Sequence, residues 1–280
     1  MRKKSEKTKI GVSSRQKGYK HIHLLNGFSF PKKRRPFFKY MPLDRFMSLA
    51  DDGEIVFVSP ETWYDPFEHM YYGLDYSSLG YKTEDIACLC VSEKSSTNED
   101  ACWKVYAGLH NKMVRISFDQ DKLLNLLDDY AEKNGCEVYI GRANYDFKKE
   151  DIDGLCNSSS KHHKKFFPTN MRREHYLSLM LLKRNSYLYE NEVRIFLVKE
   201  KIDFDNGLLR IQCGFFNQLI SKIMLAPELP DRAKSEIESS EQNEINTLNS
   251  KQIKEKLRKM FSCQVQQSQL YKNCKKKELK

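Results

Sequence analysis

The chain of 280 residues lacks any apolar run long enough to cross a membrane, and its first residues are basic and polar. A membrane-spanning helix needs about twenty consecutive apolar residues. A secretory signal peptide needs an apolar core, which the N-terminus does not contain. The sequence therefore predicts a protein of the cytoplasm that has no membrane partner.

Motifs for zinc and for the common nucleotide-binding folds are also missing. The eight cysteines are scattered, and no C-x-x-C pair is followed by a second pair, so the ligand spacing of structural zinc sites is absent. Cys88 and Cys90 flank Leu89 in an apolar run and are expected to pack as small buried thiols. Neither G-x-G-x-x-G nor G-K-S/T occurs, which argues against a Rossmann or P-loop site. We expect no bound metal.

Acidic residues are scarce at the two ends of the chain. Residues 1–35 carry twelve Lys or Arg against one acid, and residues 264–280 carry five Lys against one. The whole chain has a net charge of +10, so the part between the ends is mildly acidic. We expect a basic, flexible extension over residues 1–35, a single catalytic-type domain over residues 36–262 and a basic tail over residues 263–280. The ends could attract nucleic acid without sequence preference, or they could act only as solubilising tails.

The part between the ends has the composition of a packed domain, and the chain contains 15 Tyr and 16 Phe. Alternating or continuous apolar runs predict strands, and apolar residues at helical spacing predict helices. The expected strands are 37–40, 54–59, 86–92, 113–119, 136–143, 208–213 and 221–226. The expected helices are 42–50, 101–110, 121–134, 172–182, 215–220, 230–239 and 251–260. These elements predict an α+β fold with a mixed, split central sheet and flanking helices.

A further strand is predicted over residues 187–198, which read Y-L-Y-E-N-E-V-R-I-F-L-V. Alternate side chains of a strand share a face, so Glu190, Glu192 and Arg194 are expected on one side. Same-face neighbours lie about 7 Å apart, which is close enough for Arg194 to influence the ionisation of Glu192. The alternative is a solvent-exposed edge with an ion pair of little consequence.

Four stretches together resemble a bacterial family of domains of unknown function. They are F-K-Y at 38–40, D-P-F-E at 65–68, W-K-V-Y-A-G-L-H at 103–110 and Y-E-N-E-V-R at 189–194. Their order and spacing match the family across residues 37–226. The chain departs from the family pattern at Tyr64, where Asn is usual, and at Asn111, where Gly is usual. The second departure bears on any role that needs a phosphate close to that backbone.

The layout also resembles that of ADP-ribosyltransferases, especially those that modify nucleic acid. This resemblance implies an ADP-ribosyltransferase-like fold and NAD as the co-substrate. It implies that Glu192 stabilises the oxocarbenium character of the ribose, with Glu190 and Arg194 as further catalytic residues. The implied cofactor residues are Lys39, Tyr40, Trp103, Tyr106 and His110, and the implied substrate residues are Asp65 and Glu68. Core packing is the alternative for Trp103, and capping of the following backbone is the alternative for Asp65.

Three functions stay open from the sequence. The first is an intracellular ADP-ribosyltransferase, a toxin or anti-phage effector that acts on nucleic acid or protein and has an antitoxin or defence-system partner. The second is a non-catalytic domain that binds nucleic acid or protein through its basic tails. The third is a nuclease built on Asp65, Glu190 and Glu192.

Overall fold

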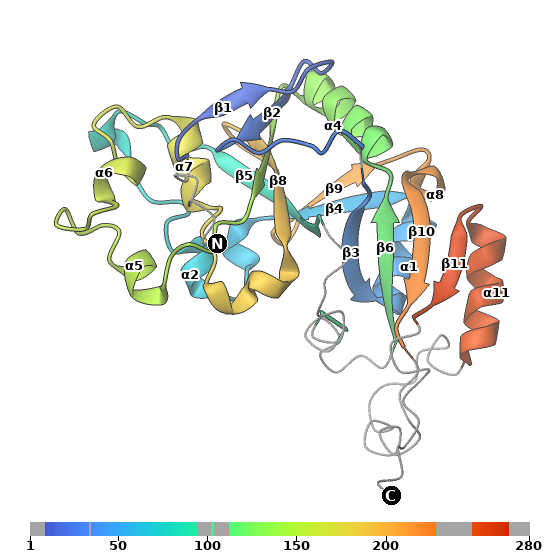
Figure 1. The fold of residues 1–280 in the computed structure, drawn as a ribbon. Coiled ribbons are helices and arrows are strands. Elements are labelled where there is room, and N and C mark those ends of the chain that lie inside the picture. Colours follow the sequence, from blue (N-terminus) through green and yellow to red (C-terminus); the bar gives the residue numbers. More distant parts are fainter. Residues whose placement is uncertain (1–8, 34, 94–101, 104–111, 228–247, 269–280) are drawn as a thin grey trace, which may run out of the picture. The chain divides into compact units, whose positions relative to one another are not determined.

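The computed structural model describes residues 9–33, 35–93, 102–103, 112–227 and 248–268 (Figure 1). The chain divides into two compact units, each assembled from separate stretches of sequence. The first unit comprises Met1–Arg35, Val56–Glu93 and Leu123–Ile211, and the second comprises Pro36–Ile55, Lys94–Lys122 and Gln212–Lys280. Helices and strands are interspersed along the chain, and parallel and antiparallel pairings both occur. The predicted α+β class with a mixed sheet is confirmed.

The first unit is built on a sheet in which five strands lie in the order β1-β2-β7-β8-β5. Their bounds are Ser13–Arg15, Ile22–Leu25, Glu137–Arg142, Glu192–Lys199 and Asp85–Ser92. β2 runs parallel to β7, and the other neighbours are antiparallel. β8 lies between β7 and β5, so a strand with neighbours on both sides carries Glu192 and Arg194.

Short helical segments surround this sheet. The α-helices are α2 (Pro66–His69), α4 (Gln120–Asn134, of which Leu123 onward belongs to this unit), α5 (Lys149–Asp153), α6 (His163–Phe166) and α7 (Arg173–Leu179). The 3-10 helices are η1 (Pro60–Thr62), η2 (Ser77–Leu79) and η3 (Asn185–Glu190). The core beneath them is rich in aromatic side chains, among them Tyr71, Tyr76, Phe166 and Tyr176. This aromatic packing fixes the short segments that carry the polar residues described below.

The second unit contains strands in the order β3-β6-β10-β11. Their bounds are Phe37–Pro42, Met113–Phe118, Ile220–Leu225 and Gln264–Gln267. Its described residues include the helices α1 (Leu43–Asp52), α8 (Phe216–Leu219) and α11 (Ser250–Met260). α1 ends as predicted at Gly53, whose φ of 67° is the left-handed conformation that glycine adopts readily. The sequence passes from one unit to the other within β4 (Glu54–Val58) and β9 (Leu208–Gln212), which pair with each other.

The strand predicted over residues 187–198 is wrong in its first half. Asn185–Glu190 forms η3, Asn191 has a φ of 45°, and the strand starts only at Glu192. Aromatic and alternating residues favoured an extended chain, but Asn tolerates the left-handed conformation that turns the backbone at this point. Glu190 therefore does not share a strand face with Glu192. The predicted helix 230–239, and most of the predicted helix 101–110, lie outside the described residues.

Regular structure also occurs near both ends of the chain. Residues 1–35 include β1 and β2, and residues 263–280 include β11, which pairs in parallel with β10. Gly11 donates its backbone N–H to Ser178 Oγ on α7 at 3.1 Å. Among the helices within the described part of the chain, none has the length and apolar character that a bilayer-crossing segment requires.

Candidate functional site

Arg194 is the centre of a buried ionic cluster in the first unit. Its side chain is 0% exposed, and Glu192, two residues earlier on β8, is 3% exposed. Arg194 Nε donates to Glu192 Oε1 at 2.7 Å, and Nη1 donates to the carbonyl of Met180 at 2.5 Å. Nη2 bonds the carboxylate of Glu68. The guanidinium thus joins two carboxylates that come from distant parts of the sequence.

Lys183 is the second cation of the cluster. Its Nζ donates to Glu190 Oε2 at 2.7 Å and also bonds the carboxylate of Glu192. The same ammonium lies 3.4 Å from Glu68 Oε1. Lys183 and Arg194 together therefore bridge three buried carboxylates, and we call Glu68, Lys183, Glu190, Glu192 and Arg194 the ionic cluster.

Local backbone structure explains why Lys183 and the two carboxylates of the Y-E-N-E-V-R block converge. After α7, Lys183 donates its N–H to the carbonyl of Asn144 at 3.0 Å, which ties it to the segment that follows β7. The short 3-10 helix η3 follows and leaves Glu190 buried at its end. The left-handed Asn191 directs the backbone into β8 at Glu192. Twelve residues thereby place four members of the cluster.

The D-P-F-E block supplies Glu68, the fifth member. Asp65 caps α2, because its Oδ1 accepts the N–H of Phe67 at 3.1 Å, and Pro66 occupies the first turn. This is the structural role that the sequence analysis gave as the alternative for Asp65. Its other oxygen accepts from Arg184 Nε at 2.8 Å. The cap fixes the direction of a very short helix and so directs Glu68 toward Arg194.

The charges of the ionic cluster fix its protonation. Burial alone would raise the pKa of Glu192, but Arg194 and Lys183 hold it well below its ordinary value. Burial alone would lower the pKa of Lys183, but Glu192, Glu68 and Glu190 raise it above its ordinary value. Both groups are therefore charged at neutral pH. Glu192 is therefore a fixed anion at neutral pH.

Aromatic side chains surround the ionic cluster. The guanidinium of Arg194 lies 4.2 Å from the centre of the Trp63 ring. The ammonium of Lys183 lies 5.1 Å from the centre of the Tyr187 ring. The hydroxyl of Tyr145 accepts the backbone N–H of Glu192 at 3.1 Å. Burial raises the pKa of Tyr145, so this phenol stays neutral. The cluster is thus held between rings, in surroundings from which water is largely excluded.

The structure brings together five of the site residues expected from the sequence: Asp65, Glu68, Glu190, Glu192 and Arg194 all lie in the first unit. Four of them are joined directly by the ionic cluster, and Asp65 is joined to the adjacent Arg184. Sequence reasoning missed Lys183, Arg184 and Tyr145. The only local signal for the two cations was their place a few residues before the Y-E-N-E-V-R block.

Three of the predicted cofactor residues belong to the second unit. Lys39 and Tyr40 lie on β3, and Trp103 is buried with its ring edge-to-face on Tyr40, at 4.9 Å between centroids. Arg115 lies 3.4 Å from the Tyr40 hydroxyl. Core packing, the alternative for Trp103, agrees with this burial. Tyr106 and His110 lie outside the described residues.

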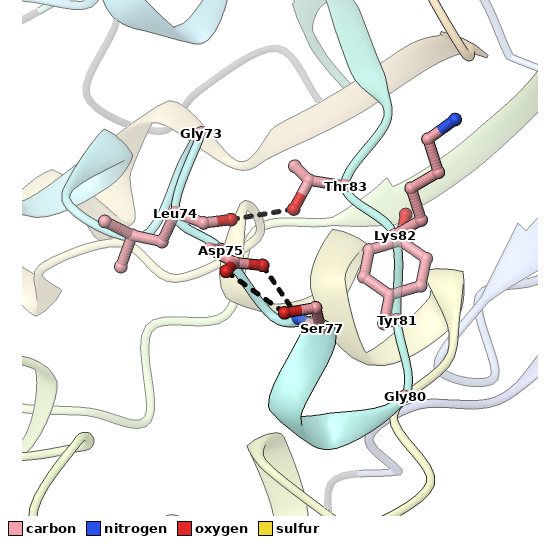
Figure 2. A pocket seen from close by; sticks show the side chains of 8 residues that line it. All are labelled: Gly73, Leu74, Asp75, Ser77, Gly80, Tyr81, Lys82 and Thr83. Atoms are coloured by element: carbon pink, nitrogen blue, oxygen red, sulfur yellow. Dashed lines mark hydrogen bonds between the residues drawn. The ribbon is translucent and has the colours of Figure 1, made fainter.

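A surface pocket of about 480 Å³ lies elsewhere in the first unit (Figure 2). It is formed by one loop, and its lining residues are Gly73, Leu74, Asp75, Ser77, Gly80, Tyr81, Lys82 and Thr83. The polar side chains bond within the loop or close to it: Thr83 Oγ1 donates to the Leu74 carbonyl at 2.7 Å, and Asp75 accepts from Ser77. None of the residues of the ionic cluster lines this pocket, so it is a separate feature.

The carboxylates of the ionic cluster surround an ammonium group instead of an open space. Glu68, Glu190 and Glu192 all lie within ion-pair distance of Lys183 Nζ. Over the described stretches of the chain, no three His, Cys, Asp or Glu side chains are grouped so that they could hold a metal ion. A metal among these three carboxylates would have to displace Lys183.

Comparisons with known proteins found a match for one region of the chain. No curated protein and no solved structure matches the sequence. A family model described as Protein of unknown function (DUF2971) matches residues 102–195. The matched region includes Lys183, Glu190, Glu192 and Arg194, but not the D-P-F-E block. The expected likeness to a family of domains of unknown function is thus confirmed for residues 102–195, which match the model of that family.

Proposed function

We propose that the chain is an NAD-dependent ADP-ribosyltransferase in which Glu192 stabilises the transition state of ribosyl transfer. The observation that carries the proposal is the state of Glu192: a buried carboxylate, ionised at neutral pH and oriented by Arg194 and Lys183. In this reaction the nicotinamide leaves with the bonding electron pair of the glycosidic bond. The ribose carbon gains positive charge, and a fixed anion close to it lowers the barrier.

The acceptor completes the reaction. A nucleophilic atom of the acceptor forms the new bond to the ribose carbon and releases a proton to water. Each oxygen of Glu192 accepts one hydrogen bond from the two cations, and a carboxylate oxygen can accept two. A ribose hydroxyl could therefore bond to Glu192 while Lys183 and Arg194 stay in place. These two cations act as positioning residues in the proposed mechanism.

The rings around the ionic cluster would receive the nicotinamide. Trp63 and Tyr187 lie against the two cations, and flat rings bind a planar heterocycle at low cost in conformational entropy. The roles expected for Lys39, Tyr40, Trp103, Tyr106 and His110 stay predictions. A toxin or anti-phage role, with nucleic acid or protein as acceptor and an antitoxin or defence-system partner, also stays a prediction.

Release of nicotinamide from NAD by the purified protein tests this function. The wild type should cleave NAD, and Glu192→Gln should cleave it at least about a hundredfold more slowly, the loss expected when one group that stabilises transition-state charge is removed. Glu84→Gln is the matched control, because it breaks the partly buried pair with Arg173 outside the cluster. That variant should keep the wild-type rate. Equal rates for wild type and a folded Glu192→Gln protein would refute the role of Glu192.

A non-catalytic binding domain is the second candidate. One observation favours it: each carboxylate of the ionic cluster already bonds a cation, as in a cluster that only supports the fold. This candidate predicts no turnover of NAD and no increase in melting temperature when NAD is added. A nuclease has the least support, because Lys183 stands among the three carboxylates.

A further inference from the structure

A row of cations and aromatic rings leads from the ionic cluster toward the surface of the first unit. The ring of Phe67 lies 5.2 Å from Lys149 Nζ and 5.6 Å from the guanidinium carbon of Arg184. The ring of Tyr187 lies 5.3 Å from the same guanidinium carbon and 5.1 Å from Lys183 Nζ. We call the sequence Lys149–Phe67–Arg184–Tyr187–Lys183 the cation–ring ladder. Two rings alternate with three cations, all from the first unit.

The ladder is held by hydrogen bonds at its centre. Arg184 Nε donates to Asp65 at 2.8 Å, and Arg184 Nη2 donates to the hydroxyl of Tyr187 at 3.0 Å. α2 carries Phe67, α5 carries Lys149 and η3 carries Tyr187, and Figure 1 shows α2 and α5 next to each other. Lys183 and Arg184 directly precede η3. The guanidinium is therefore oriented before any ligand arrives, and its remaining N–H groups are available to an anionic oxygen.

Exposed hydrophobic side chains flank the ladder. Large hydrophobic side chains with substantial exposure in the described residues are Val12, Tyr64, Leu74, Leu188 and Phe215. Tyr64 is fully exposed, at 101%, and it directly precedes Asp65, the partner of Arg184. Leu188 is 52% exposed and directly follows Tyr187. Exposed side chains thus adjoin, in sequence, both Tyr187 and the partner of Arg184.

We infer that this surface binds single-stranded nucleic acid, with a base stacked on Tyr64 and backbone phosphates on Arg184 and Lys149. Proteins that hold single strands combine cations along the backbone with rings on which bases stack. A folded polypeptide offers few flat faces, whereas each unpaired base offers two. The chemistry of rings alternating with cations therefore favours a nucleic acid strand over a protein surface.

The inference deepens the proposed function and rests on it where the bound strand is taken as the acceptor of ribosyl transfer. Tyr64 lies between Trp63, which faces Arg194, and Asp65, which bonds Arg184. A strand held at Tyr64 would therefore present its neighbouring nucleotides near the ionic cluster, as the acceptor of ribosyl transfer. Tyr64 is also one of the two positions at which the chain departs from the pattern of the family that it resembles. Binding itself does not depend on turnover of NAD.

Fluorescence anisotropy of a labelled single-stranded oligonucleotide of about 15 nucleotides tests the inference on the full chain. Tyr64→Ala should bind at least about fivefold more weakly than wild type at a fixed salt concentration, the lower end of the contribution of one stacked base. Tyr64→Phe keeps the ring and should bind like wild type. Phe215→Ala, which removes a ring that is 65% exposed in the second unit, is the matched control and should also bind like wild type. The basic tails are the same in all four proteins, so they do not contribute to the differences.

Tyr64 is fully exposed, so its replacement should leave the melting temperature unchanged. A difference in affinity between Tyr64→Ala and wild type then reports a lost contact with the oligonucleotide and not a loss of folding. Equal affinities for Tyr64→Ala, Phe215→Ala and wild type would overturn the inference and assign any binding to the tails. The proposed function fails separately. Absence of NAD cleavage together with binding that depends on Tyr64 would keep the nucleic acid surface and remove the transferase.

Discussion

Lys183 shows at the scale of one residue how the ionic cluster depends on its cations. Its ammonium is shared by Glu68, Glu190 and Glu192, and its side chain is buried. Lys183→Met should lower the free energy of unfolding by about 3–5 kcal/mol, because removal of one partner leaves buried charges without compensation. Urea denaturation of the purified variant measures this loss.

The pH dependence of this variant separates charge from packing. Without the ammonium, Glu192 loses one of the two cations that hold its pKa low, so the stability of Lys183→Met should fall less steeply in acid than that of wild type. Arg184 lies nearer the surface than Lys183 and pairs with one carboxylate, that of Asp65. Arg184→Met should therefore lower the free energy of unfolding much less than Lys183→Met. If Lys183→Met lost no more stability than Arg184→Met, the account of the cluster would be wrong.

The sequence predicted part of this chemistry. Strand spacing indicated that Arg194 influences the ionisation of Glu192, and in the structure Arg194 donates a hydrogen bond to Glu192 and holds its pKa low. The alternative of a solvent-exposed face is wrong, since both residues are buried. Lys183 was not predicted, because its contact with Glu192 depends on a turn whose direction the strand pattern concealed. Glu68 meets Arg194 across 126 positions, a contact that spacing cannot reveal.

The corner between η3 and β8 sets the cluster at the scale of an element. Asn191 has a φ of 45° between Glu190 and Glu192, so the two carboxylates reach the same ammonium although they do not share a strand. Asn191→Gly should change stability little, because glycine adopts this conformation readily. Asn191→Val should cost at least about 1 kcal/mol, since a β-branched residue is strained there.

Thermal or urea unfolding of the two Asn191 variants measures this difference. Asn191→Val should also reduce NAD cleavage, because the shifted corner moves Glu192 relative to Lys183. A valine variant as stable as the glycine variant would show that the corner does not need a left-handed residue.

Elements with a strong local pattern could be predicted, and elements that depend on distant partners could not. α1 was predicted with its glycine terminus, and most strands were predicted within one or two residues. β11 was not predicted, because Q-V-Q-Q has little strand character and pairs with β10 only in the folded chain. α2 has four residues and depends on the Asp65 cap, so no periodicity could indicate it.

The stability of the whole molecule should depend on pH through the ionic cluster. The pKa of Glu192 is lowered in the folded state, so its contribution is present above the ordinary glutamate pKa of about 4.3 and is lost as the pH falls below it. The pKa of Lys183 is raised, so its contribution is present below about 10.4 and is lost as the pH rises further. Stability should therefore be greatest between these limits.

Urea denaturation across this range tests the pH dependence. Glu192→Gln has no carboxylate at this position to take up a proton in acid, so its stability should fall less steeply in acid than that of wild type. An identical acid dependence of both proteins would show that Glu192 does not have a lowered pKa in the folded state.

In the whole molecule, the D-P-F-E block and the Y-E-N-E-V-R block contact each other through Glu68 and Arg194. The D-P-F-E block lies outside the region matched by the family model, yet Glu68 bonds Arg194 inside that region. A functional account of residues 102–195 therefore has to include the segment that precedes them. Glu68→Gln should accordingly remove the ion pair between Glu68 and Arg194 and lower the rate of any reaction at Glu192.

Single-turnover release of nicotinamide from NAD is the most direct test of the central claim, because it reports bond cleavage without the need to know the acceptor. The account predicts cleavage by wild type and Glu84→Gln, and a rate at least about a hundredfold lower for folded Glu192→Gln. Cleavage at the same rate by wild type and Glu192→Gln, or no cleavage of NAD by any of the three proteins, would contradict it.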